Sequence, residues 1–373
     1  MYFLNVENIR IINFRNYQSI GLKLNKNINI FIGNNAQGKT NLMEAIYMCS
    51  FGKSFRTNRD KEIINIHKDQ AYVGANINIG QRKKLIEIKM ERNKAKRIRV
   101  NKSELDSHKE LYSGLSVVIF TPEDLKIVKE GPRERRGLLN RGIEQIRPVY
   151  NHNMSEYRKI LYQRNNLLKS NRFKKDISSL LDVFDIQIAK IGTSIILERS
   201  RYLSILNNIV NDIHRQITKE SEDLQLRYIT NVKILEDRGE MERLYLKSLK
   251  NNIDRDLEYG TTEIGPHRDD ISMTINHKDV RVYGSQGQQR TVVLSIVLSE
   301  VRLLKNEKGM YPVLILDDVF SELDDERKRY LTNFFKDIQT FITTTDYNDL
   351  KFMDNFKKDI FYIENGKLRT RNN

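Results

Sequence analysis

Short segments in which apolar and polar residues alternate fill the first third of the chain. They include Asn27–Ile32, Ala71–Ile79 and Leu85–Met90, and a two-residue period is that of β-strands with one buried face. One apolar run, Leu42–Met48, lacks this alternation and predicts a helix. Residues 1–121 are therefore predicted to form a sheet-rich lobe.

A helical period replaces the alternation from Pro122 onward. Apolar residues such as Leu181, Phe184 and Ile188 recur every three or four positions, which is typical of amphipathic helices. The pattern predicts a helical lobe over residues 122–263. Apolar heptads extend over a few turns at most, so any coiled coil is expected to be short.

Strand patterns return in residues 264–373, which are predicted to complete the sheet-rich lobe. The chain has five prolines, and no segment has the composition of a flexible linker. The predicted fold class is α/β, with a sheet-rich lobe that the helical lobe interrupts in the sequence. The elements expected in this last part are the strands Ile271–Ile275 and Val280–Tyr283, the helix Thr291–Leu304, and the strands Val313–Leu316 and Phe341–Thr344.

The strongest chemical signal is a glycine-containing loop between the first buried strand and the first helix. It matches the P-loop pattern G-x-x-x-x-G-K-S/T at every fixed position, and its backbone N–H groups would converge on phosphate. Lys39 is predicted to contact the β- and γ-phosphates of ATP, and Thr40 to bind Mg²⁺. A chance match is the alternative, which the flanking strand and helix disfavour. The predicted nucleotide contacts are Gly33, Asn34, Asn35, Ala36, Gln37, Gly38, Lys39, Thr40 and Asn41.

A second signal is an apolar strand, Val313–Leu316, that ends in two carboxylates. Asp317 is predicted to bind Mg²⁺, through a water molecule, and Asp318 to orient or deprotonate the water that attacks ATP. Alone, such a strand is more often one that ends at the solvent. The P-loop in the same chain favours the catalytic interpretation, in which Asp318 and Lys39 are the catalytic residues.

A third signal opens the helix expected at Thr291–Leu304. The segment Tyr283–Arg290 resembles the ABC signature, whose usual form is Leu-Ser-Gly-Gly-Gln. Ser285 is predicted to cap the helix and contact phosphate, Gly287 to allow close backbone approach, and Gln288 to contact nucleotide. The alternative is an ordinary serine-capped helix after a glycine turn.

In the ABC class, the signature of one chain completes the P-loop site of a second chain. An ATP-dependent homodimer is therefore predicted, with two chains facing head to tail around two ATP molecules. The segment Ser321-Glu322-Leu323-Asp324 resembles the D-loop that crosses this interface. Asp324 is a candidate contact to the other subunit and its nucleotide, and an acidic helix N-terminus is the alternative.

Further motifs occur in the order found in the RecF family of bacterial recombination-repair proteins, which the chain resembles along essentially its whole length. The resemblance implies an ABC-type, SMC/Rad50-like P-loop ATPase head with an inserted helical lobe and no long coiled coil. Besides the P-loop, the signature and the acidic strand, the motifs that carry it are Asn13–Tyr17, Gly52–Thr57, Pro122–Leu125, Gly131–Arg136 and Gly265–Asp270.

The same resemblance implies a function in DNA repair. Members of the family bind single-stranded and duplex DNA at gaps, dimerise on ATP and hydrolyse it slowly, with stimulation by DNA. They work with the partner RecR to help RecA replace SSB. Spacing and charge by themselves predict less, namely a Mg-ATP switch on a basic protein.

The net charge of +15 would attract a polyanion such as DNA, although a solvated basic surface is the alternative. Arg97 and Arg99 belong to a basic strand-turn cluster and are candidate DNA contacts. Arg133 and Arg136 on one predicted helix are two more, but they could instead brace the two lobes. Arg56 lies in a loop that resembles the arginine loop of SMC-like heads, near nucleotide or DNA.

The chain departs from the usual ABC pattern at two places. Where transporter-type ABC ATPases carry a switch histidine, this chain has Thr343-Thr344-Thr345-Asp346, so a hydroxyl or carboxylate is expected to sense the γ-phosphate. No clear Q-loop glutamine is found, and Thr121–Asp124 stands in its place. The other functional classes considered are the ATP-binding subunit of another ABC-class system, such as a transporter, and an ATP-binding scaffold that does not hydrolyse.

The single cysteine, Cys49, lies in the apolar run of the first helix, which favours a packed thiol and a reducing compartment. No apolar run reaches the length of a membrane span, and the first residues carry charges and asparagines where a signal peptide would be apolar. A cytoplasmic location without a membrane partner is therefore predicted.

Overall fold

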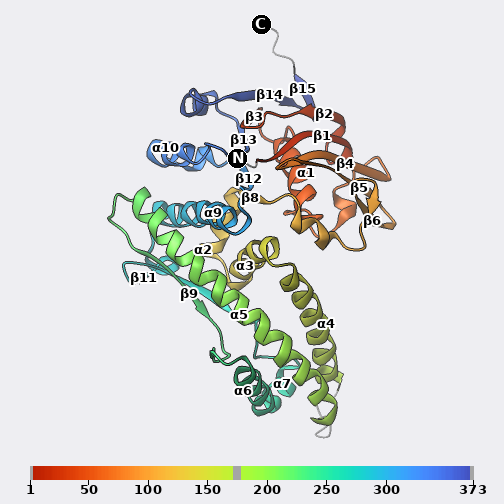
Figure 1. The fold of residues 1–373 in the computed structure, drawn as a ribbon, viewed down its shortest axis with the longest axis vertical. Helices are drawn as coiled ribbons and strands as arrows, with labels where there is room; N and C mark the ends of the chain where they lie inside the picture. The colour runs from red at the N-terminus through yellow and green to blue at the C-terminus, as the bar shows by residue number, and fades with distance from the viewer. Residues whose placement is uncertain (1–2, 171–177, 370–373) are drawn as a thin grey trace. The chain divides into compact units, whose positions relative to one another are not determined.

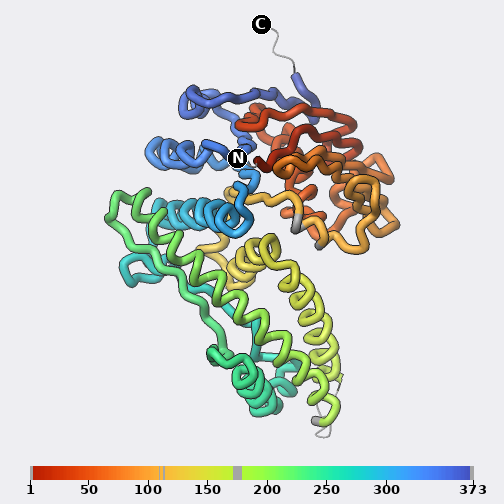
Figure 2. The backbone as a smooth tube through the Cα atoms, in the orientation of Figure 1, coloured from red at the N-terminus to blue at the C-terminus, as the bar shows by residue number. Residues whose placement is uncertain are grey.

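The computed structural model describes residues 3–170 and 178–369, and its fold is drawn in Figure 1. The chain forms two compact units. The sheet unit comprises residues 1–125, 212–221 and 286–373, and the helical unit comprises residues 126–211 and 222–285. Figure 2 follows the backbone along the chain through both units. The sheet unit is thus assembled from segments that are far apart in the sequence.

One sheet of the sheet unit is antiparallel, with its strands in the order β2-β1-β4-β5-β6-β7. Ala71, Val73 and Ile77 in β4 are buried on one face, which gives the alternation read from the sequence. The strands predicted at Ala71–Ile79 and Leu85–Met90 are confirmed as β4 and β5. The bounds are Leu4–Phe14 for β1, Tyr17–Lys23 for β2, Gln70–Ile79 for β4, Arg82–Glu91 for β5, Lys94–Val100 for β6 and Ser103–Glu104 for β7.

The second sheet of this unit has the order β15-β14-β3-β13-β12-β8. Its strands are parallel except for β15. Every residue of β3, β12 and β13 is buried, as in a parallel sheet covered on both faces. The carboxyl ends of these three strands meet at one edge, where ligands bind in such sheets. The bounds are Ile28–Ile32 for β3, Val117–Phe120 for β8, Val313–Asp317 for β12, Thr340–Thr344 for β13, Lys358–Glu364 for β14 and Lys367–Arg369 for β15.

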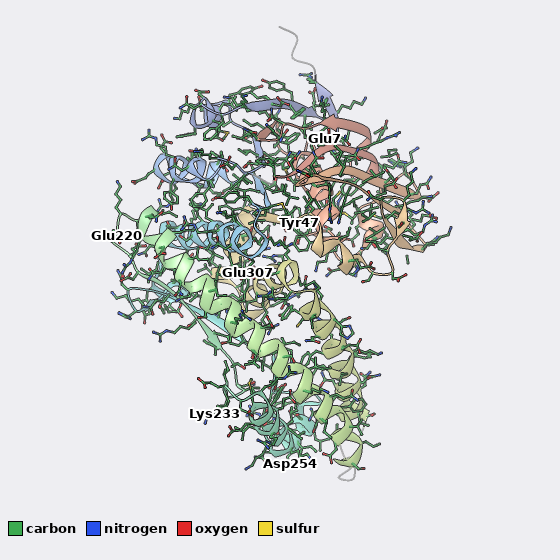
Figure 3. The ribbon with its side chains drawn as sticks, in the orientation of Figure 1. Glu7, Tyr47, Glu220, Lys233, Asp254 and Glu307 are labelled. Atoms are coloured by element: carbon green, nitrogen blue, oxygen red, sulfur yellow. The ribbon has the colours of Figure 1, made fainter. Side chains whose placement is uncertain are left out.

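Helix α1 (Lys39–Phe51) packs against strands of both sheets. Its residues Leu42, Met43 and Ile46 are fully buried in one core cluster with side chains from both sheets. Tyr47, labelled in Figure 3, is buried in the same helix. The helix predicted at Leu42–Met48 is therefore confirmed and is longer. The other helices of this unit are α9 (Gln286–Lys308), α10 (Asp325–Asn333) and the 3-10 turns η1 (Asp60–Glu62), η2 (His108–Ser113), η3 (Pro122–Leu125), η4 (Phe320–Glu322) and η5 (Tyr347–Met353).

The helical unit contains long helices and a small sheet of order β11-β10-β9. Helix α5 runs on beyond the unit, and its residues 212–217 are counted with the sheet unit. None of the helices in the described part of the chain combines the length and apolar composition that a membrane crossing requires. The elements are α2 (Lys126–Lys129), α3 (Pro132–Ile146), α4 (Pro148–Ser170), α5 (Ser178–Ile217), β9 (Leu224–Ile229), α6 (Arg238–Asn251), α7 (Ile253–Tyr259), β10 (Asp270–Ile275), β11 (Lys278–Asp279) and α8 (Val280–Tyr283).

Two local predictions need correction in the helical unit. Val280–Tyr283, predicted as a strand, is the short helix α8, because the Asp279 carboxylate accepts hydrogen bonds from the N–H groups of Arg281 and Val282 and caps a helical turn. Strand β9 was missed inside the predicted helical lobe. Because β10 pairs with β9 along six residues, the helical unit extends to residue 285, whereas the predicted lobe ends at residue 263.

Candidate nucleotide site

The glycine loop lies between β3 and α1, where the backbone turns in a way that only glycine tolerates. Gly38 has a φ of 113°, in the left-handed region. A Cβ at Gly33 would lie 2.3 Å from the carbonyl oxygen of Ile363. The two fixed glycines of the motif are therefore required by the fold itself.

Lys39, the first residue of α1, is buried and directs its amine back into the loop. Its Nζ donates to the carbonyl oxygens of Gly33, at 2.7 Å, and Asn34, at 3.0 Å. Burial lowers the pKa of Lys39, and the negative charges of Asp318 and Asp317 oppose this shift. The amine and the two carboxylates therefore act on one another electrostatically, as the predicted site requires.

Thr40 and Asp317 lie side by side at the carboxyl edge of the parallel sheet. The Thr40 hydroxyl donates to Oδ1 of Asp317 over 3.1 Å, and the Thr343 hydroxyl donates to the same oxygen over 2.7 Å. Burial raises the pKa of Asp317, while these two hydrogen bonds act in the opposite direction. A hydroxyl oxygen and a carboxylate oxygen in contact are the kind of hard ligands that Mg²⁺ takes.

Asp318 follows β12 and is only partly buried. Its φ of 58° lies in the left-handed region, which is unusual for a residue with a Cβ. Its N–H donates to the Thr343 hydroxyl over 2.9 Å. The two adjacent aspartates are therefore both tied to one threonine on the neighbouring strand.

Polar groups from two segments that are distant in the sequence form hydrogen bonds with Gln37 and Gly38 of the glycine loop. The Asn16 side-chain amide donates to the carbonyl oxygen of Gln37 at 2.9 Å, and the Tyr17 hydroxyl donates to that of Gly38 at 3.0 Å. The N–H of Asn365, in the turn between β14 and β15, donates to Gln37 Oε1 at 2.6 Å. These roles were not predicted, although Asn16 and Tyr17 lie in one of the motifs that carry the resemblance described above.

Arg56 is held next to the first turn of α1. Its guanidinium donates to Asn41 Oδ1 at 2.8 Å and lies 3.6 Å from the buried Glu44 carboxylate. Glu44 also accepts two hydrogen bonds from Arg15, at 2.8 and 2.6 Å, and a short one from the Ser54 hydroxyl. Asn41 and Arg56 are thereby brought together, and Glu44 is a site-supporting residue that sequence reasoning missed.

The signature-like segment is exposed where α9 begins. Ser285 and Gly287 are exposed and Gln288 is partly exposed. Gly287 is fixed locally, because its carbonyl oxygen accepts a hydrogen bond of 2.8 Å from the Thr291 hydroxyl. The adjacent Tyr283, in α8, has 71% of its surface exposed. The segment is therefore open to a partner molecule.

Asp324 has a capping role in the sheet unit. Its carboxylate accepts a 2.9 Å hydrogen bond from the N–H of Arg327 and so caps α10, and it also pairs with the Arg327 guanidinium. The same guanidinium donates to the Thr291 hydroxyl in α9 over 2.7 Å. About half of the Asp324 side chain stays exposed, which leaves it accessible to a second chain.

Arg97 and Arg99 project from β6 and pair with neighbouring acids. The guanidinium of Arg97 lies 2.9 Å from Glu91, and that of Arg99 lies 3.5 Å from Glu104. Both side chains are nearly half exposed, so these pairs are surface ion pairs of the kind that contribute little to stability. Phosphate groups could replace such acids as partners of the two arginines.

Arg133 and Arg136 differ, although they lie on the same helix, α3. Arg133 is exposed, whereas Arg136 is partly buried and donates to the carbonyl oxygen of Asp269 over 2.7 Å. Burial, reinforced by the nearby Arg199, lowers the pKa of Arg136. Arg136 is therefore engaged inside the helical unit, and among these two the geometry favours Arg133 as a surface contact.

This fold and this site define a P-loop ATPase head of the ABC/SMC type. The family described as RecF/RecN/SMC N terminal domain matches residues 5–368. A solved Smc head from Pyrococcus furiosus, bound to the C-terminal domain of ScpA, has 15% sequence identity and a TM-score of 0.55, covering 98% of this chain and 96% of that one. At this identity the likeness concerns the fold alone.

Closer relatives identify the family. The DNA replication and repair proteins RecF of Clostridium botulinum (strain ATCC 19397 / Type A) and Alkaliphilus oremlandii (strain OhILAs) are 44% and 45% identical, covering 98% and 97% of this chain and 99% of each relative. The solved recombination mediator protein RecF-ATPrS of the RecFOR pathway is 36% identical with a TM-score of 0.91, covering 98% of this chain and 97% of that one. The chain belongs to the RecF family of DNA replication and repair proteins.

Proposed function

We propose that this protein is an ATP-dependent DNA-binding switch of recombinational repair. The proposal rests on the position of Lys39, Thr40 and Asp317 at the carboxyl edge of the parallel sheet. There the Thr40 hydroxyl oxygen lies 3.1 Å from Asp317 Oδ1. ATP binding is supported by the relatives, since one solved RecF structure is that of RecF-ATP. The switch consists of ATP-dependent closure of a dimer on DNA and its release on hydrolysis.

In this proposal the loop from Gly33 to Gly38 cradles the phosphates with its backbone N–H groups. Lys39 exchanges the loop carbonyls for the β- and γ-phosphate oxygens, and Asn41 lies at the same helix N-terminus, where the helix dipole also favours anions. Thr40 and, through a water molecule, Asp317 would hold Mg²⁺. When bound, this ion supplies neutralisation of the negative charge on the β- and γ-phosphate oxygens.

Asp318 is the proposed base that orients the attacking water. The water oxygen forms a bond to the γ-phosphorus while the bond from that phosphorus to the β–γ bridging oxygen breaks, which yields ADP and inorganic phosphate. The proton of the water passes toward the Asp318 carboxylate. The reaction is slow and is stimulated by DNA, so hydrolysis resets a switch.

The exposed signature segment supports a head-to-tail homodimer. Ser285, Gly287 and Gln288 contact the γ-phosphate held by a second copy of the chain, and the exposed half of Asp324 reaches the same interface. Because ATP bridges the two copies, dimerisation depends on it.

DNA is the proposed polyanionic partner of the basic surface. Single-stranded and duplex DNA at gaps contact Arg56, Arg97, Arg99 and Arg133, while Arg136 supports α3. Since phosphate contacts release counterions, raised salt weakens binding. In the cytoplasm a RecR-type partner links the complex to the exchange of SSB for RecA. The RecFOR pathway named for a solved relative supports this assignment.

The mass in solution, measured with and without Mg-ATP, tests the switch. ATP is expected to convert monomer to dimer, and gapped duplex DNA to bind the dimer more tightly, with lower affinity at higher salt. Lys39→Ala is expected to lose nucleotide binding. Ser285→Arg is expected to bind nucleotide and remain monomeric, while Ser204→Arg, which adds the same charge at an exposed position of α5, dimerises normally. A Ser285→Arg protein that still dimerises on ATP refutes the head-to-tail arrangement.

A further inference from the structure

Thr343 contributes one hydroxyl group to both aspartates of the site. The residue is fully buried in β13, and its Cα pairs with that of Asp317 in the parallel register of β12 and β13. Its hydroxyl donates to Asp317 Oδ1 over 2.7 Å and accepts the N–H of Asp318 over 2.9 Å. Since a hydroxyl has one proton, its donor capacity is used by Asp317.

The hydrogen bond from the Asp318 N–H helps to hold the unusual backbone conformation of that residue. Asp318 has a φ of 58°, a conformation that brings its Cβ close to backbone atoms and that persists where surrounding contacts hold it. The Thr343 hydroxyl is one such contact. Removing it would leave the Asp318 N–H without this acceptor, and Asp317 Oδ1 with Thr40 as its remaining hydroxyl partner.

We infer that Thr343 is a positioning residue for the metal ligand and the water-orienting acid. It fixes the carboxylate of Asp317 and the backbone of Asp318 at the same time, from a strand that carries neither. This inference rests on the proposed function. It differs from direct sensing of the γ-phosphate by a hydroxyl at Thr343, because that proton is directed to Asp317.

Another threonine of the same strand provides a matched control. Thr340 begins β13 and is as fully buried as Thr343. Its hydroxyl donates to the carbonyl oxygen of Ile338 over 3.4 Å, and it lies outside the segment Thr343–Asp346 that is expected to sense the γ-phosphate. Thr340→Val therefore removes a buried hydroxyl from the same strand and leaves Asp317 and Asp318 untouched.

The test measures affinity for a fluorescent, non-hydrolysable ATP analogue in EDTA and in Mg²⁺, together with kcat and KM for ATP. Thr343→Val is expected to keep the EDTA affinity within about twofold and to lose about tenfold of the gain that Mg²⁺ gives. Its kcat is expected to fall about tenfold or more, with a smaller change in KM. Thr343→Ser is expected to restore both quantities, and Thr340→Val to preserve them.

Three results would overturn the inference: a Thr343→Val protein that keeps the gain from Mg²⁺, a Thr343→Ser protein as defective as Thr343→Val, or an equal loss in Thr340→Val. Thermal melts show whether each variant folds. If Thr343→Val does not fold, Thr343→Cys, whose thiol is a weaker donor and acceptor, is expected to lose part of the gain. Wild-type protein that binds the analogue under neither condition refutes the proposed function itself, and the role of Thr343 with it.

Discussion

Replacing Glu44 by Gln tests whether a buried carboxylate holds the Arg56 loop beside the P-loop helix. The Glu44 side chain is fully buried, while that of Arg15 is 18% exposed and that of Arg56 is 44% exposed. Gln keeps the shape and one acceptor oxygen but removes the negative charge. Arg15 would then lie partly buried beside a neutral amide, with its bidentate pair broken.

The magnitude follows from the exposure of the partners. Removing one member of a fully buried ion pair costs about 3–5 kcal/mol of unfolding free energy. Because water can reach part of Arg15, the expected cost of Glu44→Gln is smaller, about 2–3 kcal/mol. Arg56 contributes little to this number, since its contact with Glu44 is longer, at 3.6 Å, and more exposed.

Urea unfolding followed by far-UV circular dichroism measures the effect, since the chain has no tryptophan to report by fluorescence. Arg59→Gln is the matched control, because Arg59 lies in the same loop and pairs with Glu62 at the surface, with 73% of its own side chain exposed. Its expected effect is within about 0.5 kcal/mol. In a double-mutant cycle, Glu44→Gln and Arg15→Gln are expected to couple by about 1–3 kcal/mol. A cost below about 0.5 kcal/mol for Glu44→Gln, or additive single effects, would refute the reasoning.

Two further predictions concern pH. Burial lowers the pKa of His267 to about 4, so between about pH 6.5 and 4 the unfolded chain binds a proton that the folded chain does not bind. The unfolding free energy should therefore fall by about 2–3 kcal/mol as the pH falls from 7 to 4.5. Urea unfolding of His267→Gln should show less of this loss. Burial lowers the pKa of Lys308 to about 8, so between about pH 8 and 10.5 the unfolded chain binds more protons than the folded chain. The unfolding free energy should therefore rise by about 1–3 kcal/mol as the pH rises through this window. Lys308→Met should remove the rise in the same urea assay. An equal pH dependence in wild type and variant contradicts either prediction.

The parts of the site that follow a fixed local geometry could be predicted from the sequence. The P-loop needs glycine at two positions and a lysine at the first position of the helix, so its pattern can be recognised in the sequence alone. Long-range partners leave no such trace. Thr343 contacts Asp317 because β13 and β12 pair in parallel register. In the sequence, Glu44 is one polar residue in an apolar helix, and only the fold shows that Arg15 lies beside it.

The fold shows the same limit. Strands β4 and β5 have one buried face and alternate clearly, so they were predicted within a few residues. The six-residue strand β9 lies between long helices and carries no turn signal that sets it apart. For α8, the capping aspartate Asp279 decided the helix, while its apolar alternation suggested a strand. Short elements therefore depend on capping and pairing more than on periodicity.

Buried charges in this protein differ in how their neighbours pair them. In the helical unit, Arg199 is enclosed and bonded to the Pro266 carbonyl oxygen at 2.5 Å, the Tyr150 hydroxyl at 2.9 Å and the Asp269 carboxylate at 3.3 Å. These partners tie Pro266 and Asp269 of the motif Gly265–Asp270 to the interior of that unit, while Arg268 of the same motif is exposed.

In the sheet unit the arrangement differs. Asp317 is buried, yet its neighbour Asp318 is partly exposed, and the amine of Lys39 is bonded to backbone carbonyls and to neither carboxylate. Lys39 interacts electrostatically with two carboxylates but is bonded to neither. It can therefore bind phosphate oxygens without breaking an ion pair. Because phosphate brings negative charge to a lysine whose positive form burial disfavours, binding also stabilises the charged amine. At the carboxyl edge of the parallel sheet, Lys39 is thus bonded to backbone carbonyls, whereas Arg199 in the helical unit is bonded to a carboxylate.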